Sequence, residues 1–539
     1  MTTRIKALLE DELQQALSRL KWGEFIDQLE VIKPDYKYGD YATNLPLRLT
    51  KALKLNPAAI GQQLEETLLA SEVFTKAVAL TKLANGFLNF QLRPEFLEQL
   101  ALAALADDGF GYLNLGQGKK VNLEFISANP TGPLTLHNIR GGVVGDVLAN
   151  ILERSGYAVT REYIVNDAGH QIEILGLSAL ARVGLIDDST DYYHGDYVKN
   201  WANNNLEFLQ NNVHQPFEVG QSLAGYLLEY EIKPVISNGL GIQYDVYFSE
   251  WQELHQTGAI IQVFNKLKES QVIYEKDGAW WLATSRFGDD QDRVVRKNDG
   301  QFTYFLADIA YHLNKLARGA VKTIYVFGAD HHGHTIKLNA ALQLINQPPA
   351  EFIIFQLMTV LEGDKEIRMS KRAGRFVTMK DLLTQVPVDV VRFFTLRYSV
   401  NTVMQFNLQE ALDTSEKNPV YYVQYAYARL RHILAQPLVQ TALANKKIDQ
   451  ISLEETSLAL IKQVMEWPEL IASISESYQV HQLVTYALSL ADAFHRFYDQ
   501  LRVIEDNQVR LDRLGSLCLA EKALFQVLTT IGVVAPEQM

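Results

Sequence analysis

The first hundred residues alternate between apolar positions at helical spacing and short apolar runs. Apolar residues three or four positions apart indicate an amphipathic helix, and short runs between turn residues indicate strands. The pattern predicts a helix through Ile5, Leu8, Leu9 and Leu13, a polar turn at 38–44, a helix reaching residue 53, strands at 74–80 and 87–92, and a helix at 94–107. We therefore predict a small α/β module over residues 1–110.

From about residue 118 the pattern becomes an alternation of strands and helices. It predicts a strand at 121–126, a helix at about 137–155, a strand at 157–165, a helix at 303–318, a strand at 323–327 and a helix from about 333. This spacing implies a right-handed parallel crossover, the opening of a doubly wound nucleotide-binding fold. Residues of about 180–285 have helical patterns and are a predicted insertion within a domain at 116–405.

Helical patterns alone continue after residue 405, and 436–455 is a connection of low hydrophobicity. The predicted fold class is therefore α/β. It combines a Rossmann-like doubly wound parallel-sheet domain with an N-terminal small α/β module and a C-terminal all-α bundle at 406–539.

Composition narrows the class of protein. Hydrophobic residues make up 47% and charged residues 21%, as in globular proteins. No apolar run approaches the roughly 18 residues that cross a bilayer, and the acidic residues Glu10 to Glu12 argue against a signal peptide. The single cysteine, Cys518, excludes a disulfide within the chain and a multi-cysteine zinc site. These features predict a cytoplasmic protein without a membrane partner.

The first candidate site is a Pro- and Gly-rich segment at 130–142, where a predicted strand leads into a predicted helix. The open N–H groups of a helix start bind phosphate readily. Gly132, Gly141, Gly142 and Gly145 let the backbone approach a ligand closely. On spacing alone, a glycine-rich packing turn without a ligand remains an alternative.

A second candidate is a basic, glycine-containing loop at 361–380, which has six basic and three acidic residues. Its cations could neutralise charge on a departing pyrophosphate, although a solvated basic loop has the same composition. The net charge of −13 excludes a bulk electrostatic attraction for nucleic acid but leaves local phosphate contacts open.

A third candidate combines an acidic and an aromatic residue. Tyr304 and Asp308 are four positions apart and share one face of the predicted helix at 303–318. The sequence after the strand at 323–327 holds His331, His332 and His334, which also permits a zinc site. We favour nucleotide binding there, because zinc ligands usually come from separate elements.

Several strings resemble one family. Residues 127–134 and 140–146 resemble the first signature of bacterial arginyl-tRNA synthetases, and 368–374 is similar to the Lys-Met-Ser-Lys-Ser loop of class I synthetases. The resemblance extends to 38–44, 193–197, 240–250 and 418–426, so it covers essentially the full chain. The departure is at 135–138, where Thr-Leu-His-Asn stands for the family's His-Ile-Gly-His.

This resemblance implies an arginine–tRNA ligase with a C-terminal anticodon-binding domain. Such an enzyme activates L-arginine with ATP, supplied as its Mg²⁺ complex, to arginyl-adenylate, and transfers the arginyl group to the 3′ end of tRNA-Arg for protein synthesis. It implies no structural metal, and we expect a monomer.

The resemblance also assigns residues by role. Those implied in catalysis are Thr135, Asn138, Arg368 and Lys371. Those implied in ATP binding are Pro133, Leu136, His137, Gly141, Gly328, Asp330, His331, Met369, Ser370 and Lys371. Those implied in arginine binding are Asn129, Asn166, Asp167, Gln171, Tyr304, Asp308 and His331. Those implied in tRNA binding are Tyr41, Asn44, Tyr421, Tyr425 and Arg429.

Two alternatives remain open at this point. The first is a catalytically impaired tRNA-binding relative, which is motivated by Thr135 and Asn138 in place of histidines. The second is another class I synthetase, although Asp308 disfavours a glutamate enzyme, and a cysteine enzyme would need zinc-binding cysteines that this sequence lacks.

Overall fold

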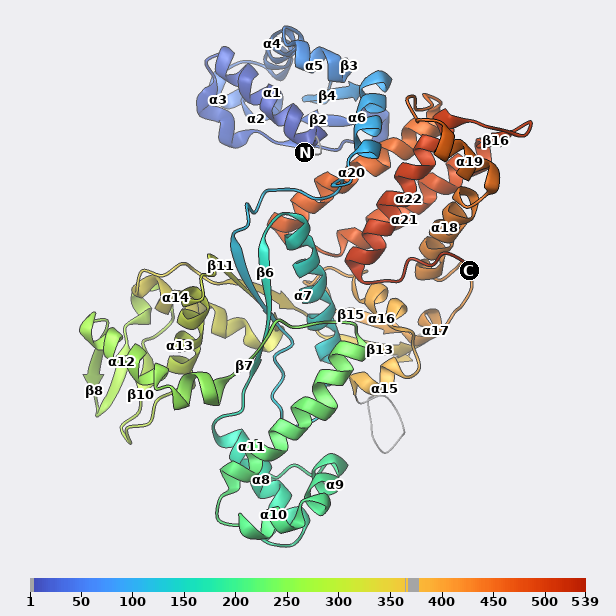
Figure 1. Cartoon of the computed structure of the whole chain (residues 1–539). Coiled ribbons are helices and arrows are strands. Elements are labelled where there is room, and N and C mark those ends of the chain that lie inside the picture. The colour runs from blue at the N-terminus through green and yellow to red at the C-terminus, as the bar shows by residue number, and fades with distance from the viewer. Residues whose placement is uncertain (1–3, 364, 367–377) are drawn as a thin grey trace.

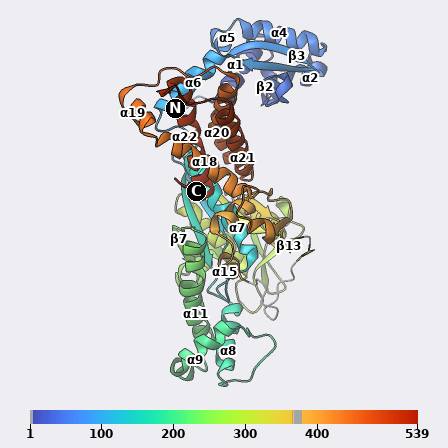
Figure 2. The ribbon, with the colours of Figure 1, turned by 90° about the vertical axis from the view of Figure 1, so that its right-hand side faces the viewer.

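The structure is a computed structural model that describes residues 4–363, 365–366 and 378–539. The described residues form an elongated molecule (Figure 1). The N-terminal module and the central sheet domain lie at opposite sides of the C-terminal helical bundle, and a helical lobe projects from the far end of the sheet domain. The same order is visible after a 90° turn (Figure 2).

The N-terminal module is a four-stranded antiparallel sheet, ordered β1-β2-β4-β3, packed against helices. Its elements are α1 (Ile5–Arg19), η1 (Gly23–Gln28), β1 (Val31–Ile32), η2 (Tyr36–Tyr38), β2 (Tyr41–Thr43), α2 (Leu45–Arg48), α3 (Thr50–Leu53), α4 (Pro57–Leu69), α5 (Glu72–Ala77), β3 (Val78–Ala84), β4 (Phe87–Leu92) and α6 (Pro94–Ala106).

Two local predictions in this module are wrong. The predicted strand at 74–80 begins as helix α5, because the Ser71 hydroxyl accepts the Phe74 N–H and caps a helical turn. The predicted polar turn at 38–44 contains strand β2, whose residues Tyr41–Thr43 are buried against β4. Tertiary burial decides both segments.

The central sheet has five parallel strands, namely β5 (Lys120–Phe125), β6 (Ala158–Val165), β7 (Val246–Ser249), β11 (Lys322–Gly328) and β12 (Glu351–Phe355). Their order is β12-β11-β5-β6-β7, so the winding direction reverses between β5 and β11. This is the predicted doubly wound topology, in which ligands bind at the carboxyl ends of the strands where the order reverses.

Helices cover both faces of this sheet. They are α7 (Leu136–Arg154), α13 (Tyr304–Ala317) and α14 (His332–Leu344). The short helix η7 (Ala329–His331) directly precedes α14. Because strand side chains alternate between faces, Leu123 and Phe125 of β5 join the core that includes α7, whereas Glu124 contacts Lys315 of α13.

The predicted insertion at about 180–285 is not uniformly helical. It contains β7 of the main sheet and an antiparallel sheet, β10-β9-β8. The elements between β6 and α13 are α8 (His170–Arg182), α9 (Asp196–Asn204), α10 (Leu206–Asn211), α11 (Pro216–Leu227), the π-helical turns η3 (Leu228–Ile232), η4 (Val235–Gly239) and η5 (Trp251–Gln256), and α12 (Ala259–Glu269), β8 (Ile273–Lys276), β9 (Ala279–Leu282), η6 (Thr284–Phe287) and β10 (Arg293–Arg296). Helices α8–α11 have a hydrophobic core of their own and form the projecting lobe.

A small sheet and the bundle complete the chain. The elements are β13 (Met358–Glu362), β14 (Lys365–Glu366), α15 (Met379–Leu383), α16 (Val388–Thr395), β15 (Met404–Asn407), α17 (Leu408–Ala411), α18 (Pro419–Leu434), α19 (Pro437–Asn445), α20 (Glu455–Ser477), α21 (Gln482–Gln500), β16 (Ile504–Glu505), β17 (Gln508–Val509) and α22 (Leu511–Ile531). The prediction of helices alone after 405 misses the hairpin β16–β17, and the predicted connection at 436–455 contains α19.

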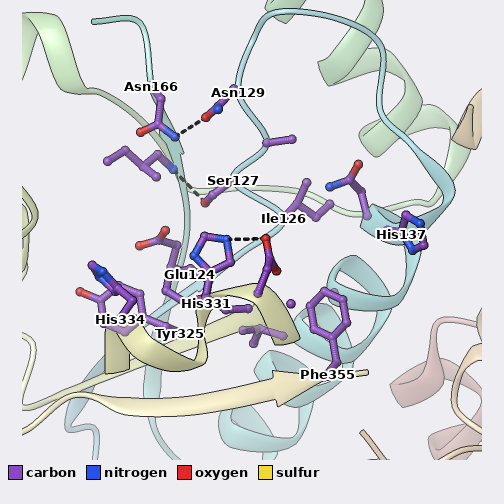
Figure 3. A pocket seen from close by; sticks show the side chains of 18 of the residues that line it. Glu124, Ile126, Ser127, Asn129, His137, Asn166, Tyr325, His331, His334 and Phe355 are labelled. Carbon is purple, nitrogen blue, oxygen red and sulfur yellow. Dashed lines mark hydrogen bonds and ion pairs between the residues drawn. The ribbon is translucent and has the colours of Figure 1, made fainter. Parts of the chain in front are cut away.

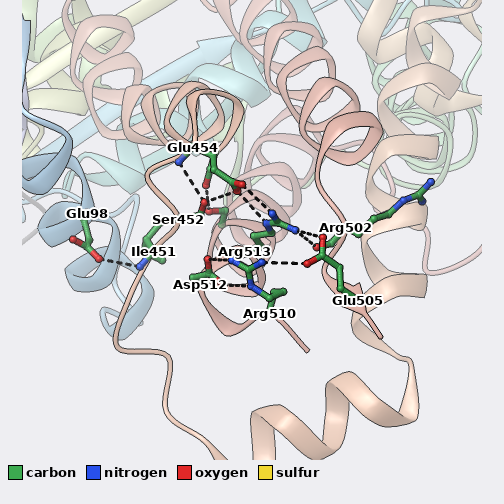
Figure 4. A network of polar contacts seen from close by, with 11 residues as sticks. Glu98, Ile451, Ser452, Glu454, Arg502, Glu505, Arg510, Asp512 and Arg513 are labelled. Carbon is green, nitrogen blue, oxygen red and sulfur yellow. Dashed lines mark hydrogen bonds and ion pairs between the residues drawn. The ribbon is translucent and has the colours of Figure 1, made fainter. Parts of the chain in front are cut away.

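A polar network around Arg513, at the start of α22, connects separate segments of the bundle (Figure 4). Arg513 donates to both oxygens of Glu454, at 2.9 and 3.0 Å, to Glu505 at 2.6 Å, and to the carbonyl of Arg502 at 2.8 Å. By length and composition α22 is long and apolar enough to cross a membrane, but 72% of its most apolar window is buried inside the protein, as in the core helix of a bundle.

Candidate active site

The chain bends sharply just after β5. Ile126 has φ = 64° and Ser127 has φ = 43°, a backbone region that is strained for L-residues and especially for a β-branched one. Hydrogen bonds hold the bend: Tyr244 donates to the Phe125 carbonyl at 2.7 Å, and the Ser127 hydroxyl accepts the Ile164 N–H at 3.3 Å. The bend carries the following segment, 128–135, across the carboxyl edge of the sheet.

That segment ends at the start of α7. The N–H and hydroxyl of Thr135 both donate to Oδ1 of Asn138, at 2.9 and 3.0 Å, so these two residues stabilise the first turn of the helix. Leu136 is only 1% exposed and packs in the hydrophobic core. Fully buried Arg140 donates to the carbonyls of Gln356 (2.7 Å) and Ser399 (2.8 Å) and anchors this end of the helix.

Gly141 lets α7 lie close to the end of β12. A Cβ atom on Gly141 would be 2.9 Å from the Phe355 ring, and one on Gly145 would be 2.3 Å from the ring of Phe125 on β5. Because these glycines carry no side chain, α7 packs closely against the sheet. Its N-terminus therefore lies at the point where the strand order reverses.

A cavity of about 460 Å³ lies at this reversal point, between the carboxyl ends of β5 and β11 (Figure 3). Figure 3 shows Glu124 and His334 on one side of it and His137 and Phe355 on the other. Its lining includes the predicted residues Asn129, His137, Asn138, Gly141, Asn166, Asp308, Gly328, Asp330 and His331. Nδ1 of His137 is buried and has no hydrogen-bond partner among the described residues.

An adjoining cavity of about 290 Å³ is lined by the predicted residues Gln171 and Tyr304, and it shares Asn129, Asn166 and Asp308 with the first. Three amides form a chain along its wall. Asn166 donates to Asn129 at 2.7 Å, and Asn129 donates to Gln171 at 2.7 Å. Tyr304 is 62% exposed and lies against Gly169, where a Cβ would be 2.3 Å from the tyrosine hydroxyl.

Four carboxylates border these two cavities. Asp308 lines both, Glu124 and Asp330 line the larger, and Glu250 lines the smaller. Burial raises the pKa of Asp308 to about 7; the charge of Lys337 opposes the rise, and the Glu250 and Glu124 carboxylates add to it. Glu124 and Glu250 are 2% and 6% exposed. Such a concentration of negative charge suits a cationic ligand. Neither Glu124 nor Glu250 was among the predicted site residues. Both lie in or next to strands, and only the register of those strands directs them at the site.

The histidine-containing segment lies beside Asp308. His334 Nδ1 is 3.7 Å from Asp308 Oδ2, and the His331 ring packs 4.9 Å from the Phe327 ring, centroid to centroid. Burial lowers the pKa of His334 to about 4, with help from the charges of Lys337 and His331, so its imidazole is neutral at physiological pH. Within the described residues, no group of three or more His, Cys, Asp or Glu side chains is arranged to hold a metal ion.

Besides Thr135 and Leu136, two further predicted residues do not line either cavity. Asp167 is not among the residues lining either cavity; its carboxylate accepts the Ser249 hydroxyl at 2.5 Å and the Trp251 N–H at 2.8 Å, and so ties the ends of β6 and β7 together. Pro133 lines a separate cavity of about 190 Å³ next to Tyr197, whose hydroxyl donates to the Thr131 carbonyl at 2.7 Å.

The structure describes residues next to the second signature but not the signature itself. Arg368, Met369, Ser370 and Lys371 lie outside the described residues. The next described residue along the chain, Thr378, pairs with Thr135, and the Met379 N–H donates to the Leu134 carbonyl at 2.9 Å. The described end of the 361–380 loop therefore lies beside the first signature.

The residues predicted to contact tRNA have mixed exposure. Tyr41 is 5% exposed in the core of the N-terminal module, and Asn44 Oδ1 is buried without a hydrogen-bond partner among the described residues. On α18, Tyr421 is half-buried, whereas Tyr425 and Arg429 line a cavity of about 500 Å³. The Arg429 guanidinium stacks 3.9 Å above the Tyr498 ring, so both partners face this cavity.

The Rossmann-like sheet, its cavity at the reversal point and the C-terminal bundle have the architecture of a class I aminoacyl-tRNA synthetase, and family models agree. The class I (R) tRNA synthetase catalytic domain matches residues 101–392, and the DALR anticodon binding domain matches 423–539. The arginyl tRNA synthetase N-terminal domain matches residues 5–92.

Individual relatives point to the same family. The chain is 36% identical to an arginine–tRNA ligase of Aquifex aeolicus, over 99% of this chain and 100% of that protein. It is 38% identical to one of Bacillus licheniformis, over 99% of each. In fold it resembles the arginyl-tRNA synthetase of Thermus thermophilus, with a TM-score of 0.77 and 22% identity over 99% of this chain and 100% of that one.

The chain belongs to the arginyl-tRNA synthetase family. It is an aminoacyl-tRNA ligase, and the predicted fold class is confirmed. The alternative of another class I synthetase is wrong, because the arginine family's catalytic and N-terminal models both match.

Proposed function

We propose that this chain activates L-arginine with Mg²⁺-ATP and transfers the arginyl group to tRNA-Arg, acting as a monomer in the cytoplasm. One observation carries the proposal: the carboxylates of Glu124, Asp308, Asp330 and Glu250 line two adjoining cavities at the reversal point of the sheet, beside the N-terminus of α7. Negative charge suits the two cationic ends of arginine, and a helix N-terminus suits phosphate.

The reaction has two steps. The arginine carboxylate attacks the α-phosphate of ATP, pyrophosphate leaves, and the terminal ribose hydroxyl of tRNA then takes the arginyl group from the adenylate. The protein supplies little covalent chemistry, so catalysis rests on positioning and on stabilising charge. Lys371 and Arg368 are proposed to stabilise the departing pyrophosphate. The pairing of Thr378 with Thr135 supports this, because it brings the end of their segment to α7.

Within the amino-acid part of the site, we assign Asp308 and Tyr304 to the guanidinium, and the amide chain of Asn129, Asn166 and Gln171 to the α-amino group. The hydrogen bonds along that chain support a fixed polar wall. Glu124 and Glu250 add charge on the same side. We assign His137, with its unpartnered Nδ1, Gly141, Gly328, Asp330 and His331 to the nucleotide.

For Thr135 and Asn138 we propose a role in holding the start of α7 in position for the phosphates, because their side chains hydrogen-bond each other. For tRNA, we propose that unstacked anticodon bases bind at Tyr425 and Arg429. Aromatic faces stack bases, and the 500 Å³ cavity beside these residues leaves room for one.

The test is arginine-dependent ATP–pyrophosphate exchange, run with and without tRNA-Arg and followed by aminoacylation. We expect exchange that requires arginine, and charged tRNA as the product. The rival is a relative that binds tRNA without catalysis. That rival would retain tRNA in a filter-binding assay yet give no exchange under any condition, and this outcome would overturn the proposal.

A further inference from the structure

Lys315, on the face of α13 that packs against the sheet, is a fully buried cation. Its side chain is 0% exposed, and its Nζ donates to Glu124 Oε2 at 2.5 Å. A buried ammonium is costly unless it is paired. Burial lowers the pKa of Lys315, and the carboxylates of Glu124 and Glu162 oppose that fall. None of the roles assigned above uses this residue.

A second carboxylate lies nearby but already has its own partners. Glu162 Oε1 is 4.0 Å from Lys315 Nζ, yet Arg318 donates to Glu162 at 2.5 and 2.9 Å and Asn122 donates to it at 3.0 Å. Burial acts to raise the pKa of Glu162, but Arg318 and Lys315 outweigh it, so the net shift is downward. Because Arg318 pairs with Glu162, Lys315 directs its hydrogen bond to Glu124.

Aromatic rings fix the ammonium in place. Nζ of Lys315 lies 4.2 Å from the centroid of the Tyr311 ring and 3.9 Å from that of Tyr325. Both rings attract a cation through their faces. Burial and the charge of Lys315 lower the pKa of His312 to about 3, so this imidazole, whose Nδ1 lies 2.9 Å from the Tyr325 hydroxyl, is neutral.

Glu124 connects this buried group to the ligand site. It lines the 460 Å³ cavity together with Asp308, His334, Tyr311 and Tyr325 (Figure 3). Its carboxylate therefore has Lys315 on the protein side and the cavity on the other. Glu124 is only 2% exposed, and a carboxylate this deeply buried is costly without a paired cation.

We propose that Lys315 is a positioning residue for the amino-acid site: through its hydrogen bond it holds the Glu124 carboxylate aimed into the cavity where a cationic substrate binds. The inference rests on the proposed function, because it takes arginine as that cation. Lys315 itself does not reach the cavity, since it is absent from the residues that line it.

The test replaces Lys315 by methionine, which keeps the length of the side chain and removes its charge. Losing a charge-assisted contact should raise the KM for arginine in pyrophosphate exchange about 10-fold or more, while the KM for ATP changes less than about 2-fold. The matched control is Lys322→Met. Lys322 also pairs with a glutamate and a tyrosine, Glu351 and Tyr478, but these lie at the opposite end of β11.

Two further readouts separate positioning from a merely structural role. In the Glu124→Gln background, Lys315→Met should change the arginine KM less than about 2-fold, because the two residues act through one interaction. In Lys315→Met alone, kcat for pyrophosphate exchange at saturating arginine should change less than about 2-fold, so that the loss appears in the arginine KM, as expected for a residue that acts on substrate binding.

Three results would overturn the inference in an enzyme that still exchanges pyrophosphate with arginine. They are an unchanged arginine KM in Lys315→Met, an equal rise in the KM for ATP, or the same factor in both backgrounds. If Lys315→Met does not fold, Glu124→Gln alone decides, since an unchanged arginine KM there also contradicts it. A wild-type chain without exchange would instead overturn the proposed function.

Discussion

Two polar networks in this chain, one centred on the buried Arg513 and the other on the buried Lys315, are built differently. In the bundle, Arg513 uses its guanidinium on Glu454, Glu505 and a backbone carbonyl, and this network borders none of the cavities described above (Figure 4). At the sheet edge, Lys315 holds Glu124, whose carboxylate also lines a cavity. The first network is complete within the protein, whereas the second retains charge for a ligand.

The backbone near the Lys315 network also differs from the backbone near the Arg513 network. At the sheet edge, Ile126 and Ser127 adopt strained left-handed conformations, and Nδ1 of His137 is buried without a partner among the described residues. In the bundle, by contrast, the hairpin β16–β17 turns through Asp506 and Asn507, residue types that tolerate positive φ. Buried polar atoms without a partner among the described residues occur in both regions, since the Tyr486 hydroxyl and His495 Nε2 of the bundle are further examples. The difference lies in the backbone, because of these two regions only the site has a β-branched residue, Ile126, at positive φ.

The largest effect is expected at the second signature. Lys371→Ala should lower the exchange rate roughly 10²–10³-fold, as for other groups that stabilise developing charge, and should leave unfolding unchanged. Stopped-flow or steady-state exchange measures it. Lys380→Ala is the control, because that exposed lysine, the last residue of the same loop, pairs with Glu231, 3.7 Å away. Full activity in Lys371→Ala would remove this residue from the mechanism.

The next effect is expected at Asp308. Asp308→Asn should lower kcat/KM for arginine on the order of 10²-fold, because one partner of a charged hydrogen-bonded pair is lost, with little change in the KM for ATP. Equal losses for both substrates would argue that Asp308 shapes the whole cavity instead.

The same residue gives a pH dependence. With its pKa raised to about 7, Asp308 in the empty enzyme is protonated below that pH and ionised above it. Because the ionised form binds a guanidinium, kcat/KM for arginine should fall as pH drops through about 7. In Asp308→Asn this limb should disappear, and its persistence would assign it to another group.

The smallest effect on activity is expected in the bundle. Arg513→Met should destabilise the bundle by about 2 kcal/mol, from the loss of hydrogen bonds to charged partners, and leave the arginine KM unchanged. Hydrogen exchange at the start of α22 measures the loss of stability. Arg510→Met is the control, since Arg510 is 42% exposed and its ion pairs are on the surface. A raised arginine KM in Arg513→Met would break the contrast between the two networks.

Part of the site was predictable from local sequence. The strand–helix–strand units containing β5, α7, β6, α13 and β11 follow from apolar periodicity, and their spans agree with the structure within a few residues. Asp308 and Tyr304 were predicted because four-residue spacing on a helix is a local property. Their roles stay predictions, as do the domain boundaries.

The rest depended on contacts between distant segments. Glu124 and Glu250 reach the site through strand register and chain crossing, and Asp167, predicted to bind arginine, is instead held by Ser249 and Trp251, which are more than 80 positions away. No local pattern reports which of two neighbouring polar residues, Asn166 or Asp167, faces the cavity.

By itself, the sequence determined the α/β class, the order of elements and the two signature segments, because periodicity and motif spacing are encoded by neighbouring residues. Only the tertiary structure decided that Thr135 pairs with Thr378, that Lys315 contacts the faces of two tyrosine rings, and that Glu124, Asp308 and Glu250 line two adjoining cavities. Charge and burial depend on what surrounds a side chain in space, and those neighbours are brought together by folding alone.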